Sequence, residues 1–261
     1  MQEHLIIGAS HALYMAQALG TVAADLSQAS AGAVPIDAPD VDGRFKLLLL
    51  SPRTRFLSFQ QGEDGGIQVT ANAALLRDVQ AHDRPGSKVF LLINGNEHNA
   101  RFMVRHARPF DFVHPGVPGL LPGRQILPLP LMHQLLSQAL LETQLTVAYL
   151  ARLLPRAQTF VVAPPPPIGC DRHIQSLPEI FDFSHHPVEH ARVRLKIYEV
   201  MLECLARAVQ PAGVRLLMPP PEHRDAVGFL REPLWFSCTH AASDYYHAVY
   251  AAAGVASLAS V

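Results

Sequence analysis

The sequence has little imbalance of charge and few cysteines, and each shortage excludes a class of protein. Its 261 residues carry 21 Lys and Arg against 22 Asp and Glu, which leaves a net charge of -1. A field this weak gives no support for binding to nucleic acid. The three cysteines, Cys170, Cys204 and Cys238, cannot form a full disulfide framework, and their wide spacing matches no zinc motif. We therefore expect reduced structural thiols, no metal and no nucleic-acid partner.

Long hydrophobic runs are missing as well. No apolar stretch approaches the ~20 residues that cross a bilayer as a helix. Residues 5–19 come nearest to a signal peptide, but Glu3 stands where such a peptide carries positive charge, and Ser10 and His11 interrupt the run. The sequence therefore predicts a cytoplasmic protein with no membrane partner.

Hydrophobic residues are otherwise plentiful, at 49% of the chain. That is enough to bury one sizeable core, and we expect a single domain over residues 1–261. Five apolar runs have the length of buried strands: residues 4–7, 45–50, 89–93, 160–163 and 214–218. Four other segments space their apolar residues as helices do: residues 12–19, 132–154, 193–208 and 241–253. The alternation predicts an α/β fold, with a mostly parallel five-stranded sheet between two layers of helices.

Two segments rich in proline and glycine, residues 110–130 and 164–184, are expected to be long loops over the ends of the strands. In an open parallel sheet, ligands bind beyond the carboxyl ends of the strands. The residues that directly follow each predicted strand are therefore the candidates for a functional site.

A serine follows the first predicted strand, in the segment Gly8-Ala9-Ser10-His11, and a predicted helix begins directly after it. A serine on such a turn is exposed, and its own N–H is among the donors that the start of a helix leaves unpaired. That combination suits a nucleophile whose product oxyanion needs a donor. Taken alone, the segment is more typical of an ordinary helix N-cap.

Two further polar segments lie at predicted strand ends or close to them. Residues 94–99 follow the third strand, where a side-chain amide can donate to an oxyanion, and a plain turn is the alternative. His240 precedes the last predicted helix, where a histidine can reach over the strand ends as a general base. Because the chain has 14 histidines, a surface role is the simpler interpretation of any one of them.

Together the three segments resemble the conserved blocks of the SGNH hydrolase family, also called GDSL-type esterases. Gly8-Ala9-Ser10 matches the family's Gly-Asp-Ser turn, and Asn94-Gly95-Asn96-Glu97 matches its Gly-x-Asn-Asp block. Ser237-Cys238-Thr239-His240, followed by Tyr245 and Tyr246, matches the Asp-x-x-His block before the last helix. The resemblance covers nearly the whole chain, and residues 164–169 and 225–230 are similar to a bacterial branch of the family.

The resemblance implies a flavodoxin-like fold and roles for single residues. Ser10 would be the nucleophile and His240 its base. Asn96 and the Ser10 N–H would donate to the oxyanion, together with a glycine N–H that stays undecided among the glycines at positions 62, 65 and 66. No organic cofactor or metal is implied.

Departures from the family pattern bear on these roles. Ala9 replaces an aspartate whose role in the family is usually structural, and Glu97 replaces a second aspartate, which is a mild change. Ser237 stands where the family has the acid that orients the histidine. Without a carboxylate the imidazolium is less stabilised and the tautomer less well fixed, so we expect a Ser–His dyad or very low activity.

A second histidine competes for the role of base, because Asp244-Tyr245-Tyr246-His247 also spells Asp-x-x-His. It would place His247 two turns inside the last helix, and the spacing of the downstream tyrosines fits His240 better. His98 and Asn99, beside the third block, are candidates for substrate binding or for a purely structural role.

The function that follows is a serine ester hydrolase acting on a small-molecule or carbohydrate O-acyl ester, with acetylated sugars as one substrate class. Two alternatives stay open. One is a binding protein that kept the fold and lost the chemistry, and the other is an acyltransferase that uses the same site. The sequence specifies neither the acyl group nor the alcohol, and it leaves the oligomeric state undetermined.

Overall fold

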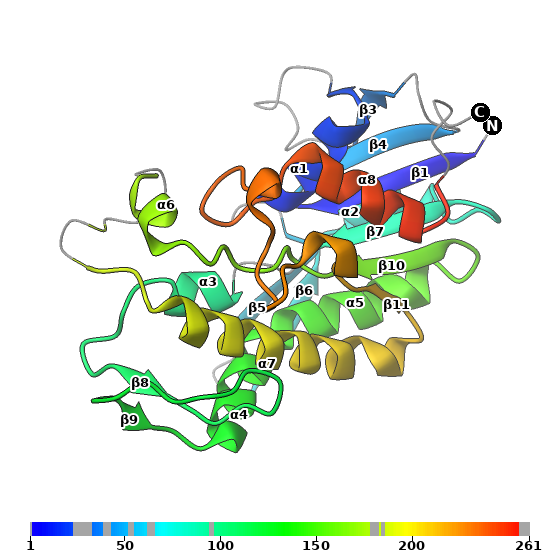
Figure 1. Ribbon diagram of the computed structural model, residues 1–261. Coiled ribbons are helices and arrows are strands. Elements are labelled where there is room, and N and C mark those ends of the chain that lie inside the picture. Colours follow the sequence, from blue (N-terminus) through cyan, green and yellow to red (C-terminus); the bar gives the residue numbers. More distant parts are fainter. Residues whose placement is uncertain are drawn as a thin grey trace.

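A seven-stranded sheet forms the centre of the computed structural model of this protein (Figure 1). The structure describes residues 2–22, 33–38, 43–51, 55–61, 66–93, 97–177, 183 and 186–255. Five strands run parallel: β1 (Glu3–Gly8), β4 (Arg44–Leu49), β7 (Lys88–Leu92), β10 (Gln158–Val162) and β11 (Arg215–Leu217). They coincide with the five apolar runs of the sequence, so the predicted parallel sheet is confirmed.

The sheet is two strands wider than the sequence predicted. Its order is β11-β10-β7-β1-β4-β3-β2, and β2 (Thr21–Val22) and β3 (Val34–Asp37) join its edge in antiparallel pairing. Neither contains an apolar run, because β2 has two residues and β3 includes Pro35 and buries only Ile36. Proline and exposed side chains are typical of strands at the edge of a sheet. The sequences of β2 and β3 therefore show no pattern of buried apolar residues.

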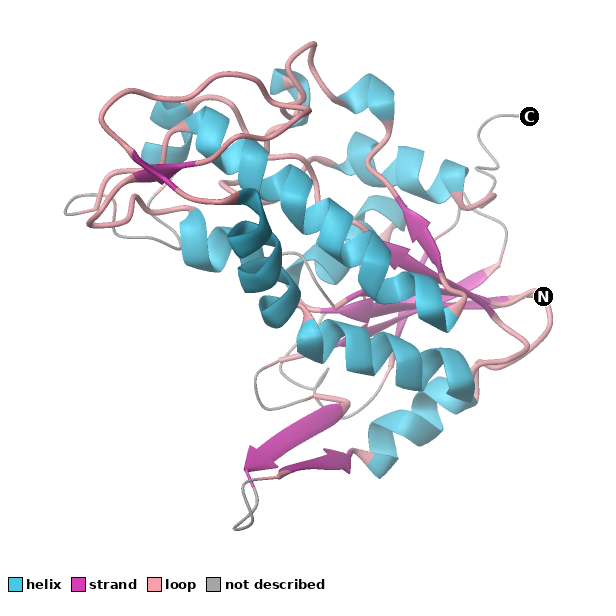
Figure 2. Ribbon diagram, turned by 90° about the horizontal axis from the view of Figure 1, so that it is seen from below, coloured by secondary structure: helices cyan, strands magenta, loops and turns pink. Residues whose placement is uncertain are grey.

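Helices cover both faces of the sheet, as Figures 1 and 2 show. One face carries α1 (Ser10–Leu19) and α8 (Ser243–Ala252), and the other carries α2 (Ala73–Gln80), α5 (Leu141–Leu153) and α7 (Ala191–Val209). The side chains of β1 divide between two hydrophobic cores. Leu5 and Ile7 belong to the core with α5 and α7, and Ile6 belongs to the core with α1 and α8. This alternation marks a strand buried on both faces, and the predicted three-layer α/β/α sandwich is confirmed.

The remaining described elements lie outside the central sheet. They are the hairpin β5 (Leu57–Gln61) and β6 (Ile67–Ala71), the pair β8 (Phe110–Asp111) and β9 (Gln125–Ile126), the helices α3 (Glu97–Phe102), α4 (Leu129–Ala139) and α6 (Asp171–Gln175), and 3-10 turns at Gln210–Ala212, Pro221–His223 and Glu232–Leu234. The helical pattern of residues 132–154 therefore divides at Leu140 into α4 and α5. The segments expected as long loops also contain β8, β9 and α6.

A buried ion pair connects the segment of residues 110–130 to α7. Lys196 and Asp111 are fully buried, and Lys196 Nζ donates to Asp111 Oδ1 at 2.7 Å and to the carbonyls of Phe112 and Gly119 at 2.8 and 2.6 Å. All three hydrogens of the ammonium group are thus used. Asp111 in turn accepts from the N–H groups of Phe112 and Leu121. Such complete hydrogen bonding offsets the large desolvation cost of burying two charges.

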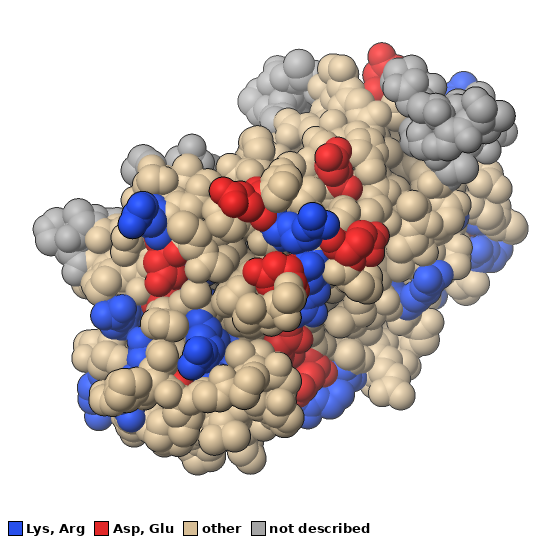
Figure 3. All heavy atoms as spheres, in the orientation of Figure 1, with Lys and Arg blue, Asp and Glu red and all other residues tan. Residues whose placement is uncertain are grey.

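Acidic and basic side chains lie beside each other on the face shown in Figure 3, as expected for a chain of almost zero net charge. Within the described ranges, no helix is long and apolar enough to cross a membrane. Cys204 and Cys238 are buried, Cys170 is partly buried, and none of the three is joined in a disulfide.

Candidate active site

Ser10 lies at the junction of β1 and α1, at the carboxyl end of the sheet. Gly8 ends the strand, and a Cβ there would come within 2.4 Å of the Leu92 carbonyl oxygen on β7, so only glycine fits this close approach. Ala9 is the N-cap of α1, and Ser10 is the first helical residue. The N-cap interpretation of Ser10 is therefore wrong, and its hydroxyl is not used to cap the helix.

His240 is the hydrogen-bond partner of Ser10. Its Nε2 lies 2.9 Å from Ser10 Oγ, although the two residues are 230 positions apart. The loop before α8 positions the imidazole, because the N–H groups of Phe236 and Ser237 both donate to the His240 carbonyl at 3.3 Å. The side chains of two of the three predicted site residues therefore meet at the end of β1.

Ser237 continues this chain of hydrogen bonds behind the imidazole. Its Oγ lies 2.7 Å from His240 Nδ1, so Ser237, His240 and Ser10 are linked in a row. The same oxygen accepts from the N–H groups of His240 at 3.2 Å and Thr239 at 3.4 Å. Geometrically, Ser237 thus occupies the place at which the acid of a Ser–His–Asp triad holds its histidine.

A serine hydroxyl does not hold the imidazole as a carboxylate does. The oxygen has two lone pairs and one proton, and two backbone N–H groups already point at it. The hydroxyl proton of Ser237 is then directed at Nδ1, which must act as an acceptor. This favours the tautomer of His240 whose single N–H proton is on Nε2. That tautomer donates to Ser10 and cannot take its proton. The productive tautomer needs Nδ1–H to donate instead, either to Ser237 Oγ or to Thr239 Oγ1 at 3.3 Å.

Burial determines the charge of His240. The residue is 5% exposed, and burial lowers the pKa of His240 to about 4, so its imidazole is neutral at pH 7. Its ring packs against Tyr14 at 4.4 Å and against His11 at 4.5 Å between centroids. Tyr14 lies one helical turn after Ser10 and therefore on the same face of α1. A neutral imidazole is the form that a general base requires.

The oxyanion donors are only partly described. Asn96, with Asn94 and Gly95, lies outside the described residues, so its role stays a prediction. The Ser10 N–H belongs to the first turn of α1, whose N–H groups have no acceptor within the helix. Of the three candidate glycines, positions 62 and 65 also lie outside the described residues, and Gly66 directly precedes the hairpin strand β6.

The other candidate residues divide into an exposed pair and a buried pair. His247 and Asp244 are exposed on α8, whereas His240 is the residue that contacts the serine. His98 and Asn99 on α3 are buried, and burial lowers the pKa of His98 to about 3. Both roles considered for His98 and Asn99 therefore stay predictions.

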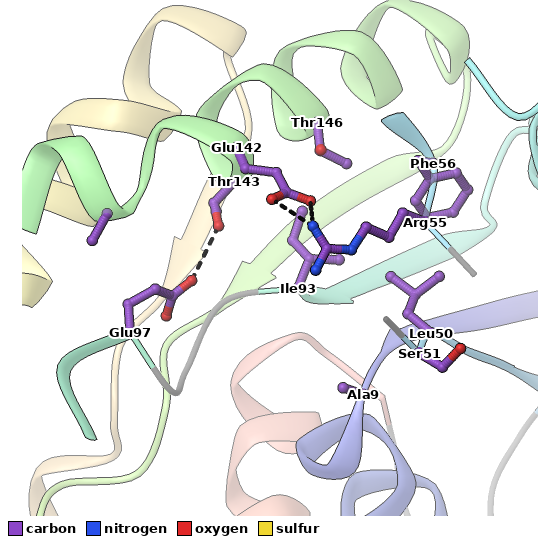
Figure 4. Close-up of a pocket in the computed structure, with 11 residues that line it drawn as sticks. Ala9, Leu50, Ser51, Arg55, Phe56, Ile93, Glu97, Glu142, Thr143 and Thr146 are labelled. Carbon is purple, nitrogen blue, oxygen red and sulfur yellow. Dashed lines mark hydrogen bonds and ion pairs between the residues drawn. The ribbon is translucent and has the colours of Figure 1, made fainter. Parts of the chain in front are cut away.

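A cavity of about 360 Å³ opens beside Ala9, the residue before the serine (Figure 4). Leu50 and Ile93, which follow β4 and β7, form part of its lining. Arg55 and Glu142 face each other in it, with Arg55 Nη1 3.3 and 3.1 Å from the two carboxylate oxygens. The volume lies at the small end of the range of ligand sites in proteins.

Sequence reasoning missed the polar groups of this cavity. Arg55 lies before β5 and Glu142 at the start of α5, and their separation of 87 residues gives no local signal. Tyr14 could have been found from its helical spacing to Ser10. Among the described residues, no group of three or more His, Cys, Asp or Glu side chains is arranged to hold a metal ion.

Comparison with known proteins finds weak structural similarity, in the path of the backbone. No protein-family model matches the chain, and no curated protein is significantly similar to it. The lipopolysaccharide acetyltransferase periplasmic domain of Salmonella ser. Paratyphi A is 12% identical, with 97% of this chain and 82% of that chain covered and a TM-score of 0.49. An extracellular lipase from Streptomyces rimosus is 13% identical, with 97% and 100% covered and a TM-score of 0.43. At these values neither similarity assigns an activity or a substrate to this chain.

Proposed function

We propose that this protein is a serine ester hydrolase of the SGNH type that cleaves small O-acyl esters. The observation that carries the proposal is the row of hydrogen bonds from Ser237 through His240 to Ser10, at 2.7 and 2.9 Å. A nucleophile, a neutral base and an orienting group in this order are the arrangement of nucleophilic acyl transfer. The position of Ser10 at the carboxyl end of a parallel strand supports the same function.

The first half of the reaction forms an acyl-enzyme. Ser10 Oγ attacks the ester carbonyl carbon while its proton passes to His240 Nε2. The oxyanion of the tetrahedral intermediate is held by the Ser10 N–H and by the side-chain amide of Asn96. The bond from carbon to the alcohol oxygen then breaks, and the proton on Nε2 goes to the departing alcohol.

The second half repeats these steps with water. Water attacks the acyl group on Ser10 and gives its proton to Nε2. The bond to Ser10 Oγ breaks, the proton returns to that oxygen, and the carboxylic acid leaves. No redox change occurs, and the residues return to their starting protonation states.

The surroundings of His240 predict a slow enzyme. In both halves the imidazole must become an imidazolium, and the burial that lowers the pKa of His240 to about 4 opposes that charge. Ser237 offers a hydroxyl where a carboxylate would stabilise it. We therefore expect turnover well below that of an enzyme with a complete triad.

A second candidate function follows from the same observation. Because Ser237 Oγ accepts two backbone N–H groups, the resting imidazole is biased towards the tautomer that cannot accept a proton. A protein in which this bias is complete would bind esters without cleaving them. The second candidate is therefore an ester-binding protein with the same fold.

A fluorophosphonate probe distinguishes the two candidates, since it labels serines that a base activates. We expect one adduct per chain, and peptide mapping should place it on Ser10. Ser10→Ala should abolish labelling, whereas Ser243→Ala should not. Ser243 is a matched control because it too is the first residue of a helix with an alanine N-cap. An unlabelled parent that still binds esters would contradict the hydrolase and support the binding protein.

A further inference from the structure

The cavity beside Ala9 lies next to the candidate nucleophile in the chain, although Ser10 and His240 are not among its lining residues. Ala9 precedes the candidate nucleophile, and Glu97, which follows Asn96, also contributes to the lining. On the opposite wall, α5 contributes Glu142 and Thr143 (Figure 4). An ester whose carbonyl carbon is at Ser10 therefore has this cavity next to it.

The lining has an apolar part near the strands and a charged part near α5. Leu50, Phe56 and Ile93 form the apolar part. Among the described lining residues, the charged part contains the carboxylates of Glu97 and Glu142 and the guanidinium of Arg55. The carboxylates of Glu97 and Glu142 would repel an anionic group placed beside them, and a long alkyl chain would remove these charges from water at a large cost.

Hydrogen bonds hold the charged groups in position. Thr143 Oγ1 donates to Glu97 Oε1 at 3.3 Å, and Thr143 is itself 4% exposed. Arg55 uses Nη1 to bind both oxygens of Glu142. Among the described residues, no acceptor is bonded to Arg55 Nε or Nη2, which leaves up to three N–H donors at the cavity. The half-exposed pair stabilises the fold little, so its place in the cavity is not explained by stability.

We propose that this cavity binds the alcohol half of the ester and that this half is a neutral polyol, such as a monosaccharide. The inference rests on the proposed function and names its substrate class. A sugar hydroxyl both donates and accepts, so neighbouring hydroxyls can donate to Glu142 and accept from Arg55. The apolar residues at the strand ends then cover the C–H face of the ring. Arg55 and Glu142 are thus residues that determine specificity.

Kinetics with two acetyl esters tests this assignment. One substrate is 6-O-acetyl-glucose, and the other is p-nitrophenyl acetate, whose alcohol half has no vicinal hydroxyls. For Arg55→Met and Glu142→Gln, the ratio of kcat/KM for the sugar ester to kcat/KM for the aryl ester should fall by about tenfold or more. The matched control is Arg77→Met, an exposed arginine on α2 that is outside the cavity, and it should leave the ratio unchanged. An unchanged ratio in both cavity variants would overturn the assignment.

Binding tests the assignment independently of catalysis. In the Ser10→Ala protein, calorimetry with 6-O-acetyl-glucose should show binding that Arg55→Met weakens by about tenfold. Absence of saturable binding would refute the polyol subsite even if aryl esters are hydrolysed. A preference for p-nitrophenyl octanoate that Arg55→Met increases would assign the cavity to an acyl chain instead. If no ester is hydrolysed but the sugar ester binds, the proposed hydrolase fails and the polyol subsite stands.

Discussion

Ser237 Oγ lies 2.7 Å from Nδ1 of His240, at the position from which an aspartate would orient a catalytic histidine. The contact keeps the geometry of a triad and removes its negative charge. Because the imidazole is buried as well, nothing in its hydrogen bonds compensates a positive charge on it.

Ser10→Ala should abolish hydrolysis of short acyl esters and leave stability nearly unchanged. Since Ala9 and not Ser10 caps α1, the change removes only the hydrogen bond to His240. We expect the free energy of unfolding to fall by about 1 kcal/mol or less. Release of p-nitrophenol and urea unfolding measure the two quantities, with Ser243→Ala as the control. Activity equal to that of the parent would show that another group is the nucleophile.

Ser237→Asp should raise kcat/KM by roughly tenfold or more, equivalent to ~1.4 kcal/mol of barrier. A carboxylate accepts only, so it fixes the proton on Nδ1 and leaves Nε2 free to take the proton of Ser10. Ser237→Asn is the control for size, because it adds no charge. If both variants have the activity of the parent, the hydroxyl of Ser237 does not limit the reaction.

The same substitution should also move the acid limb of the pH–rate profile. The base must be neutral, so activity is lost as pH falls through the pKa of His240, which burial lowers to about 4 in the parent. A carboxylate at position 237 favours the imidazolium and raises that pKa, which shifts the limb to higher pH. Profiles of kcat/KM measured on both proteins decide the matter. A limb that stays in place would mean that a group other than His240 titrates.

Substitution of the two competing histidines should give opposite results. His240→Ala removes the contact with Ser10 and should lower kcat/KM by about 10²- to 10⁴-fold. His247→Ala and Asp244→Asn change exposed side chains on α8 and should leave it unchanged. Ester hydrolysis by the three variants beside the parent is the measurement. Loss of activity in the Asp244 and His247 variants alone would reverse the choice of base.

Asn96→Ala should lower kcat by on the order of 10²-fold with little effect on KM, because the oxyanion exists only after attack. Asn96→Leu separates the donated hydrogen bond from side-chain volume, since it nearly keeps the size and removes the donor without adding a charge. Both variants should behave alike in initial-rate measurements. An effect on KM alone would make Asn96 a substrate-binding residue.

Stability should fall on acidification because of two buried histidines. Burial lowers the pKa of His98 to about 3 and that of His240 to about 4, whereas the unfolded chain titrates near the usual value of 6.5. Between pH 6.5 and the folded pKa, the unfolded state binds more protons, so stability is full above pH 6.5 and is lost as pH falls. Each histidine contributes up to about 1.4 kcal/mol per pH unit. In denaturant unfolding, the free energy of unfolding of His98→Gln should depend less steeply on pH than that of the parent. The exposed control His247→Gln should show the same pH dependence as the parent.

Much of the fold was already determined by local sequence pattern. A strand buried on both faces, such as β1, is a continuous apolar run, and the five apolar runs of the sequence coincide with the five parallel strands. Ser10 was a candidate because it follows the first predicted strand, and His240 because it precedes the last predicted helix; the resemblance to the SGNH family implied the roles of both. In contrast, β2 and β3 are too short and too exposed to show a pattern, and the division of α4 from α5 at Leu140 leaves no mark in the apolar spacing.

Only the tertiary structure decided which polar side chains meet. Ser10 and His240 are 230 positions apart, and Arg55 and Glu142 are 87 apart, so no local preference could pair them. The parallel sheet brings Ser10 and His240 together, because the end of β1 and the loop before α8 lie at the same edge of the sheet. The hydrogen bonds of Ser237 depend on how its loop folds back on His240. Sequence thus determined the elements and the residues at their ends, and packing of the layers determined the distances on which chemistry depends.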